Sequence, residues 1–135
     1  MIVLSVDPGR TYGIAVLTDG QRTLLEEHKF VDIQVFYDHI YNLANTYRPD
    51  VIIYGTPVRY TKVIAFQSKM IGILDLVALQ HNISGVPCVD VTCRKELLGN
   101  GHATKEDVMK FVGCNKGDNS ADAILFAKYF LTYQE

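Results

Sequence analysis

The apolar run at the amino terminus constrains the fold most, because it ends abruptly at an acidic residue. Residues 2 to 6 read Ile-Val-Leu-Ser-Val, and Asp7-Pro8-Gly9 follows at once. An apolar run of this length is typical of a buried strand, and the Pro-Gly pair turns the chain out of it. The sequence therefore predicts a central strand that carries the carboxylate of Asp7 at its carboxyl end.

A second acidic group stands near the carboxyl terminus. Asp118 and Asp122 are four residues apart at the start of a predicted helix over residues 119 to 133, so they share one helix face. Taken singly, Asp7 is more simply a turn cap and Asp118 a helix N-cap. Taken together, three carboxylates from distant segments favour a site for one divalent cation, and hard oxygen ligands suit Mg²⁺ or Mn²⁺. This pattern favours metal-dependent phosphoryl chemistry.

The order of the predicted elements indicates the fold class. Strands over residues 2 to 7, 12 to 17 and 21 to 31 meander through a hairpin turn at Asp19-Gly20. Helices follow over residues 32 to 47, 63 to 82, 104 to 112 and 119 to 133, with strands at 51 to 54 and 86 to 91 between them. We expect an α/β fold with a five-stranded mixed sheet flanked by helices, in a single domain covering residues 1 to 135. In such sheets the site lies beyond the carboxyl ends of the parallel strands.

Composition narrows the class of protein. The chain has 135 residues, 48% of them hydrophobic and 21% charged, which is ordinary for a globular protein. No apolar stretch reaches membrane-spanning length, the chain begins directly with a strand rather than a signal peptide, and an odd count of three cysteines indicates reduced thiols. We therefore expect a cytoplasmic protein with no membrane partner.

The net charge argues mildly against a DNA or RNA substrate, because proteins that bind nucleic acids usually carry an excess of basic residues. It is −2 at pH 7, and the sequence pI is about 6.1. The cations are unevenly placed, however, with Arg94, Lys95, Lys105, Lys110 and Lys116 all in the last third of the chain. A local basic segment of this kind can still supply phosphate contacts.

Three segments resemble one known family when they are taken in order. They are residues 6 to 9 with 12 to 15, residues 94 to 108 with their Gly-Asn-Gly-x-Ala-x-Lys stretch, and the acidic helix start at residues 118 to 123. In these segments the chain resembles the RuvC-type Holliday junction resolvases, which belong to the ribonuclease H-like superfamily. The resemblance spans nearly the whole chain, and the Gly-Asn-Gly stretch is its most specific part.

The resemblance implies an endonuclease that cleaves branched DNA as a symmetric homodimer. It assigns Asp7, Asp118 and Asp122 as catalytic residues and ligands of Mg²⁺, for which Mn²⁺ can substitute. It places the dimer face on the helix over residues 63 to 82. It also implies a location at the nucleoid, or in the host cytoplasm if the protein is viral.

The resemblance also suggests residues that contact DNA. These are Lys95, Asn100, His102, Lys105, Phe66 and Gln67. Plainer interpretations stay open: ordinary surface lysines, an exposed neutral histidine, a tight loop at residues 99 to 101 between a strand end and a helix, and a core phenylalanine. As phosphate contacts, the lysines would position DNA without reading its sequence.

One departure from the family concerns the fourth strand. The family usually has a glutamate at its end, whereas this chain has Tyr54-Gly55-Thr56-Pro57, so the missing acid falls at Tyr54 or Gly55. With three aspartates the site is expected to hold one ion well and a second more weakly, which makes cleavage slow or absent without high Mg²⁺ or Mn²⁺. An inactivating change, engineered or natural, explains the gap, and so does a replacement acid such as Asp90. Asp90 is the less favoured explanation because it is expected in mid-strand.

Three alternative functions stay open. One is a binder of branched DNA that keeps the fold without cutting. Another is a YqgF-like nuclease acting on RNA, since residues 55 to 57 are similar to that group's Gly-x-Pro. The third is an interaction protein with a vestigial acidic pocket.

Overall fold

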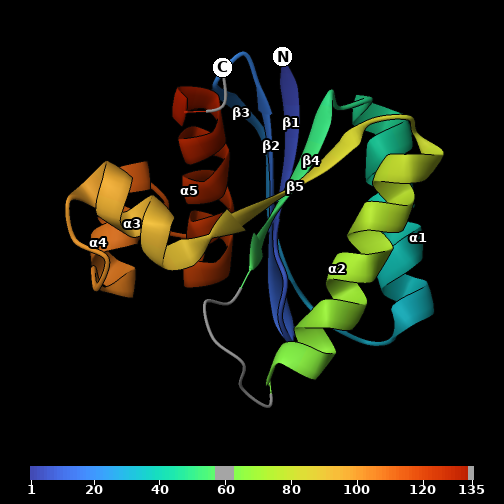
Figure 1. Cartoon of the computed structure of the whole chain (residues 1–135), viewed down its shortest axis with the longest axis horizontal. Coiled ribbons are helices and arrows are strands. Elements are labelled where there is room, and N and C mark those ends of the chain that lie inside the picture. The colour runs from blue at the N-terminus through green and yellow to red at the C-terminus, as the bar shows by residue number, and fades with distance from the viewer. Residues whose placement is uncertain (57–62, 134–135) are drawn as a thin grey trace.

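The computed structural model describes residues 1–56 and 63–133, and within them five strands form one sheet in the order β3-β2-β1-β4-β5 (Figure 1). The strands are β1 (Ile2–Asp7), β2 (Thr11–Thr18), β3 (Gln21–Lys29), β4 (Val51–Thr56) and β5 (Ser84–Val89). The helices are α1 (Ile33–Tyr47), α2 (Val63–Gln80), α3 (Asp90–Leu98), α4 (Lys105–Val112) and α5 (Asp118–Tyr133). Pro57 of the Gly-Thr-Pro run lies outside the described residues.

The sheet is mixed. β1 pairs antiparallel with β2 and parallel with β4, β4 pairs parallel with β5, and β2 pairs antiparallel with β3. Asp19 and Gly20 both have positive φ, at 50° and 81°, as the tight hairpin between β2 and β3 requires. The predicted α/β fold with a five-stranded mixed sheet is confirmed, and the carboxyl ends of β1, β4 and β5 lie at one end of it.

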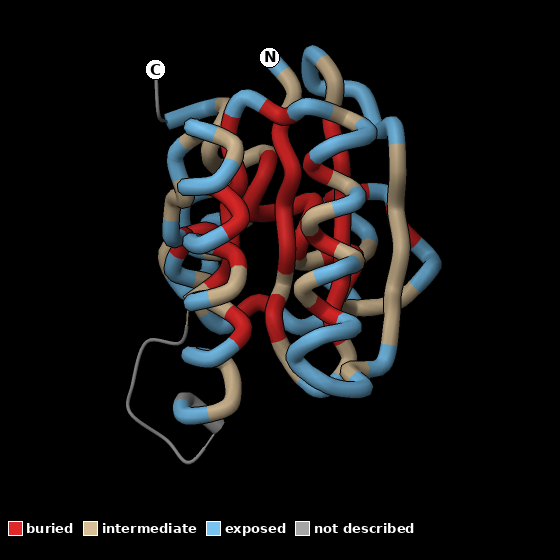
Figure 2. The backbone as a smooth tube through the Cα atoms, turned by 90° about the vertical axis from the view of Figure 1, so that its right-hand side faces the viewer, coloured by how far each residue is buried: buried red, intermediate tan, exposed pale blue. Residues whose placement is uncertain are grey.

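Helices cover both faces of the sheet. In Figure 1, α1 and α2 lie on one side, and α3, α4 and α5 lie on the other. Leu4 and Val6 of β1 join the core under α1 and α2, whereas Val3 joins the core under α5 and Ser5 bonds to α5. Alternation along the strand places Asp7 on the α5 face. Figure 2 shows buried residues running along the central strands between helices with exposed outer sides. Within the described residues, none of the helices is both long and apolar enough to cross a bilayer.

The structure corrects the prediction around Asp90. The predicted strand over residues 86 to 91 is β5 at Ser84–Val89, and the chain turns at once into α3, which begins at Asp90. An acidic residue favours the first turn of a helix, and the side chain of Arg94, four residues on, binds Asp90. Gly99, with φ of 79°, ends the helix in the left-handed conformation. Asp90 therefore stands directly after a strand end, and its mid-strand placement was wrong.

Candidate active site

A small pocket opens where the parallel strands end. Asp7 is the last residue of β1, Thr56 is the last residue of β4, and Asp90 follows β5 directly. The pocket has a volume of about 220 Å³ and is lined by Asp7, Gly55, Thr56, Gln67, Asp90 and Phe126. Two carboxylates from different strand ends thus share one cavity.

Helix α5 carries two further aspartates to the same face of the sheet, and β1 and β2 hold its first turns close. The Ser5 hydroxyl donates a 2.6 Å hydrogen bond to the carbonyl of Ala123. Gly13 pairs with Asp7 across β1 and β2, and a Cβ at this position would collide with the backbone carbonyl of Asn119. Because Gly13 has no side chain, the start of α5 can lie directly on the strand beside Asp7.

A glutamate of β3 caps the first turn of α5. Glu27 of β3 pairs with Gly13 across β2 and β3, and its Oε1 accepts the backbone N–H groups of Asn119 at 2.9 Å and Ser120 at 3.1 Å. These are among the N–H groups that a helix leaves without an intrahelical acceptor. A negative charge there also interacts favourably with the helix dipole. Glu27 therefore orients the helix that carries Asp118 and Asp122.

Replacing Glu27 by alanine is expected to lower the free energy of unfolding by about 1–2 kcal/mol, because two N–H groups lose a charged acceptor. Urea unfolding in a chelator measures this effect. The control is Glu27→Gln, which keeps one amide oxygen acceptor and is expected to lose less. An alanine variant as stable as the wild type would contradict the capping role.

Burial and neighbouring carboxylates raise the pKa of two of the clustered acids, Asp7 and Asp122. Asp7 is half-buried, and burial raises its pKa well above the usual range. The negative charges of Asp122, Asp90 and Asp118 raise it further. Burial, and then the charge of Asp90, raises the pKa of Asp122 to about 7. Such crowding of like charges is typical of functional sites. The donors are all carboxylate oxygens, which fits a hard divalent cation whose charge would relieve the repulsion.

Arg94 is the cation that the chain itself supplies to this cluster. Its Nε donates to Asp90 Oδ1 at 2.9 Å, and its Nη2 lies 3.3 Å from Asp122 Oδ1. The side chain is only 13% exposed, and its charge counteracts the rise in the pKa of Asp7. Arg94 therefore ties the start of α3 to the first turns of α5 and partly neutralises the acids.

Asp118 lies at the more open edge of the cluster. Its Oδ2 forms a 2.9 Å ion pair with Nζ of Lys105, whose side chain is 69% exposed. The hydrogen bond from Lys105 lowers the pKa of Asp118, so this carboxylate is charged at neutral pH. Asp118 is the first residue of α5, and Glu27 accepts the N–H groups of the two residues that follow it.

The positions of Tyr54 and Gly55 are both unsuited to the acid that the resemblance implies. The Tyr54 hydroxyl donates to Asp75 of α2 at 2.8 Å, on the opposite face of the sheet. A Cβ on Gly55 would collide with the ring of Phe126 of α5. A glutamate at Tyr54 would point away from Asp7, and one at Gly55 would require the buried ring to move.

Comparisons with known proteins agree on the fold. No protein-family model matches the chain, and no curated protein matches it in sequence. The structure of RuvC from Thermus thermophilus in complex with a Holliday junction substrate superposes with a TM-score of 0.85 at 18% identity, over 99% of this chain and 94% of RuvC. The Holliday junction resolvase of fowlpox virus superposes with a TM-score of 0.66 at 15% identity, over all of both chains. The fowlpox resolvase bound to its Holliday junction DNA superposes with a TM-score of 0.60 at 16% identity, again over all of both chains.

The chain has the fold of the RuvC-type Holliday junction resolvases. The resemblance drawn from the three sequence segments is confirmed at the level of the fold. All of these identities are below 20%, which explains why the sequence comparisons found nothing.

Two of the six predicted DNA contacts lie at the acidic cluster of this RuvC fold. Lys105 pairs with Asp118, and Gln67 lines the pocket while donating to the Pro8 carbonyl at 3.2 Å. Phe66 packs edge-on against Phe30, with ring centroids 4.8 Å apart. The guanidinium of Arg10 lies 4.8 Å from the centre of the Phe66 ring. Phe66 is thus half-buried beside the exposed Arg10, which agrees fully neither with a core residue nor with an exposed DNA contact.

The other three predicted contacts surround the connection from α3 to α4. Lys95 is exposed on α3, and the Asn100 side chain accepts the backbone N–H of His102, which is also exposed. The Gly-Asn-Gly turn joins two helices, which corrects the expected connection from a strand to a helix. Their role in binding DNA stays a prediction.

Sequence reasoning missed Arg94 and Glu27 as positioning residues and underrated Asp90. The spacing of Asp90 and Arg94, four residues apart with Leu97 and Leu98 before Gly99, was a helix signal that the preceding apolar run obscured. No local signal points to Glu27, because its partners are 92 and 93 residues away in the sequence.

Proposed function

We propose that this chain is a divalent-metal-dependent endonuclease that cuts branched DNA of the Holliday junction type. The observation that carries the proposal is the gathering of Asp7, Asp90 and Asp122, with Asp118 beside them, at the carboxyl end of the sheet. The fold shared with resolvases that were determined in complex with Holliday junction DNA supports the choice of substrate.

Asp7, Asp118 and Asp122 would hold Mg²⁺, with Mn²⁺ as a substitute, and Asp90 would supply the carboxylate that the fourth strand lacks. A bound divalent ion in such a site lowers the pKa of water and offsets charge on the reacting phosphate. The protein's own contribution is positioning. Arg94 holds Asp90 and Asp122, Lys105 holds Asp118, and Glu27 fixes the helix that carries two of the acids.

For DNA binding we propose contacts from the six predicted residues, with the lysines on phosphates. A four-way junction has twofold character, so two matched cuts call for a symmetric dimer. The outer side of α2 exposes Leu76 and Leu79, at 41% and 72%, which supports α2 as the dimer face. The expected assembly is a homodimer on one junction.

A nicking assay on a synthetic four-way junction tests the proposal. The full chain is incubated with Mn²⁺ or Mg²⁺, beside a chelator control, a linear duplex and an RNA duplex of the same sequence. Metal-dependent cuts near the branch point of DNA are expected. Cleavage of RNA in preference to the junction would instead support the YqgF-like alternative.

A non-cutting binder of branched DNA is the second candidate, and Arg94 is the observation that favours it. A guanidinium between Asp90 and Asp122 already serves as a counter-cation, and Gly55 brings no acid. Such a protein would bind the junction in a chelator and leave it uncut in Mn²⁺. Gel-shift and nicking assays on the same samples therefore separate the two candidates.

Thr56→Glu is expected to raise the rate of junction cutting about tenfold or more, because Thr56 lines the pocket with Asp7 and can present an additional carboxylate there. The matched control is Thr56→Gln, which has the same length without the charge. The readout is the initial nicking rate across a Mn²⁺ titration. Equal rates for the two variants would show that the extra charge does not reach the ion.

A further inference from the structure

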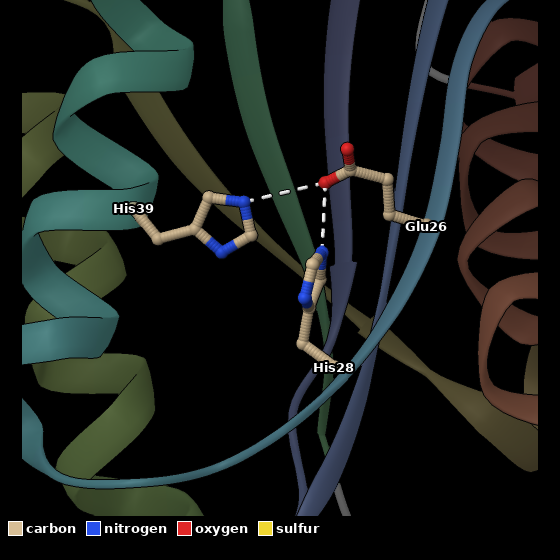
Figure 3. Close-up of side chains that lie close together, drawn as sticks. All are labelled: Glu26, His28 and His39. Carbon is tan, nitrogen blue, oxygen red and sulfur yellow. Dashed lines mark hydrogen bonds and ion pairs between the residues drawn. The ribbon is translucent and has the colours of Figure 1, made fainter.

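A second group of potential metal ligands lies on the face of the sheet opposite the aspartates. Glu26 and His28 lie two residues apart on β3, so their side chains share one face of the sheet and point toward α1. Helix α1 contributes His39 (Figure 3). Glu26 Oε1 lies 2.9 Å from Nε2 of His28 and 3.3 Å from Nε2 of His39. The ligand atoms of the three residues all lie within 4.8 Å of one another.

The distances from Glu26 to the two histidine nitrogens are close to those around a tetrahedral ion. Zinc bonds of about 2.0–2.2 Å at tetrahedral angles place neighbouring ligand atoms about 3.3–3.5 Å apart. The Glu26 to His39 separation of 3.3 Å lies within that range, and the Glu26 to His28 separation of 2.9 Å needs a small outward shift. Two imidazoles and one carboxylate also form a known zinc donor set that leaves a fourth position open.

The surroundings of His39 resemble the outer shell of a metal site. Its Nδ1 lies 2.9 Å from the hydroxyl of Tyr12, whose ring is 3% exposed and packs edge-on against Phe36. A metal-bound histidine usually donates its other ring N–H to an oxygen acceptor, which sets the tautomer and the ring orientation. The Tyr12 hydroxyl oxygen is placed to accept such a bond from Nδ1 of His39.

The site is also accessible. The side chains of Glu26, His28 and His39 are 32%, 41% and 23% exposed, so an ion and its remaining water can enter from solvent. The ligand type separates this site from the aspartate cluster, since imidazole nitrogen favours transition ions and oxygen-only sites favour Mg²⁺.

We propose that Glu26, His28 and His39 form a second metal site that binds one divalent transition ion, with Zn²⁺ as the expected occupant. β3 is an edge strand, and residues 30 to 32 join it to α1. The ion would cross-link the edge strand to the helix, and water would complete its fourth position. The next residue along β3, Glu27, caps α5 on the other face, so the ion also steadies the strand that orients the aspartates.

Zinc titration of the full chain tests the proposal. The protein is stripped with a chelator and titrated calorimetrically with Zn²⁺ in excess Mg²⁺, which occupies oxygen-only sites. One Zn²⁺ per chain is expected at micromolar affinity or tighter, together with a higher unfolding temperature. Absence of binding, or binding that leaves the unfolding temperature unchanged, would overturn the proposal.

Variants locate the ion. His28→Ala and His39→Ala are each expected to weaken Zn²⁺ binding at least about 100-fold, and Tyr12→Phe about tenfold, because loss of an outer-shell partner alone costs roughly 10–100-fold. His81→Gln, a histidine substitution directly after the end of α2, is expected to keep wild-type affinity. Unchanged affinity in both His28→Ala and His39→Ala would place the ion elsewhere and refute the site.

Cobalt substitution gives a readout that does not depend on the variants folding. In the wild-type chain, bound Co²⁺ is expected to show the visible bands of a tetrahedral nitrogen and oxygen site. The three cysteines are buried and unpaired, and thiolate-to-cobalt charge-transfer bands would reveal binding to them instead. Such bands would overturn the assignment. None of these measurements involves DNA cutting, so they stand or fall independently of the nuclease proposal.

Discussion

The Asp7→Asn variant is expected to lose at least about 100-fold in metal-dependent junction cutting and, in a chelator, to be more stable than the wild type. The loss follows from removal of a central metal ligand, because mutating even an outer-shell partner lowers metal affinity or activity roughly 10–100-fold. The gain in stability follows from removing a carboxylate that is buried among Asp122, Asp90 and Asp118. Opposite changes in activity and stability distinguish a functional acid from a structural one.

The pH dependence has a defined direction. The folded-state pKa of Asp7 lies well above that of an unfolded aspartate, near 3.9, and the pKa of Asp122 is about 7. Between these limits Asp7 and Asp122 bind more protons in the folded chain than in the unfolded chain, so their contribution to the free energy of unfolding falls as pH rises. The stabilisation is full below about pH 4 and is lost as pH rises through the folded-state values. For Asp122, whose side chain is 14% exposed, the shift corresponds to about 4 kcal/mol at most.

Urea unfolding between pH 5 and pH 8 in a chelator measures this slope, which Asp7→Asn is expected to flatten. Adding Mg²⁺ at pH 8 should stabilise the wild type and leave the variant nearly unchanged. Asp38→Asn, on the exposed side of α1, is the control and should keep the wild-type slope. A slope that Asp7→Asn leaves unchanged would contradict the crowding of the acids.

Gly13→Ala is expected to lower the free energy of unfolding by about 3 kcal/mol and to weaken metal binding at the aspartates. Its methyl group would meet the backbone carbonyl of Asn119, which cannot rotate away as a side chain can. The first turn of α5 must therefore lift from the sheet, which draws Asp118 and Asp122 away from Asp7 and breaks the capping bonds to Glu27.

The matched control is Gly72→Ala in α2, where an added Cβ meets nothing within 4 Å. Alanine in an exposed helix interior is favoured over glycine, so this variant should gain roughly 0.5–1 kcal/mol. Urea unfolding and a Mn²⁺ titration of both proteins give the comparison. Wild-type stability and Mn²⁺ affinity in Gly13→Ala would show that the start of α5 does not depend on this close contact.

The features predicted well from sequence were those with a local physical cause. The apolar run before Asp7, the Asp19-Gly20 turn and the helical period over residues 32 to 47 each depend on neighbouring residues, and each element is present. The prediction failed at residues 90 to 98, where an apolar strand passes into a helix without a break, and local patterns placed the boundary too late. That error kept Asp90 in mid-strand and away from the site.

What the amino-acid sequence determined by itself was the order of strands and helices and the positions of three aspartates at their ends. The tertiary structure decided which charges meet. It brought Asp90 and Asp122 to Arg94. It placed Glu27 at the start of α5, which can approach the sheet because Gly13 on the intervening strand has no side chain. It also placed His39 beside His28 of the edge strand. The physical reason is that local geometry follows from adjacent residues, whereas contacts between distant side chains depend on strand register and helix packing, which only the folded chain establishes.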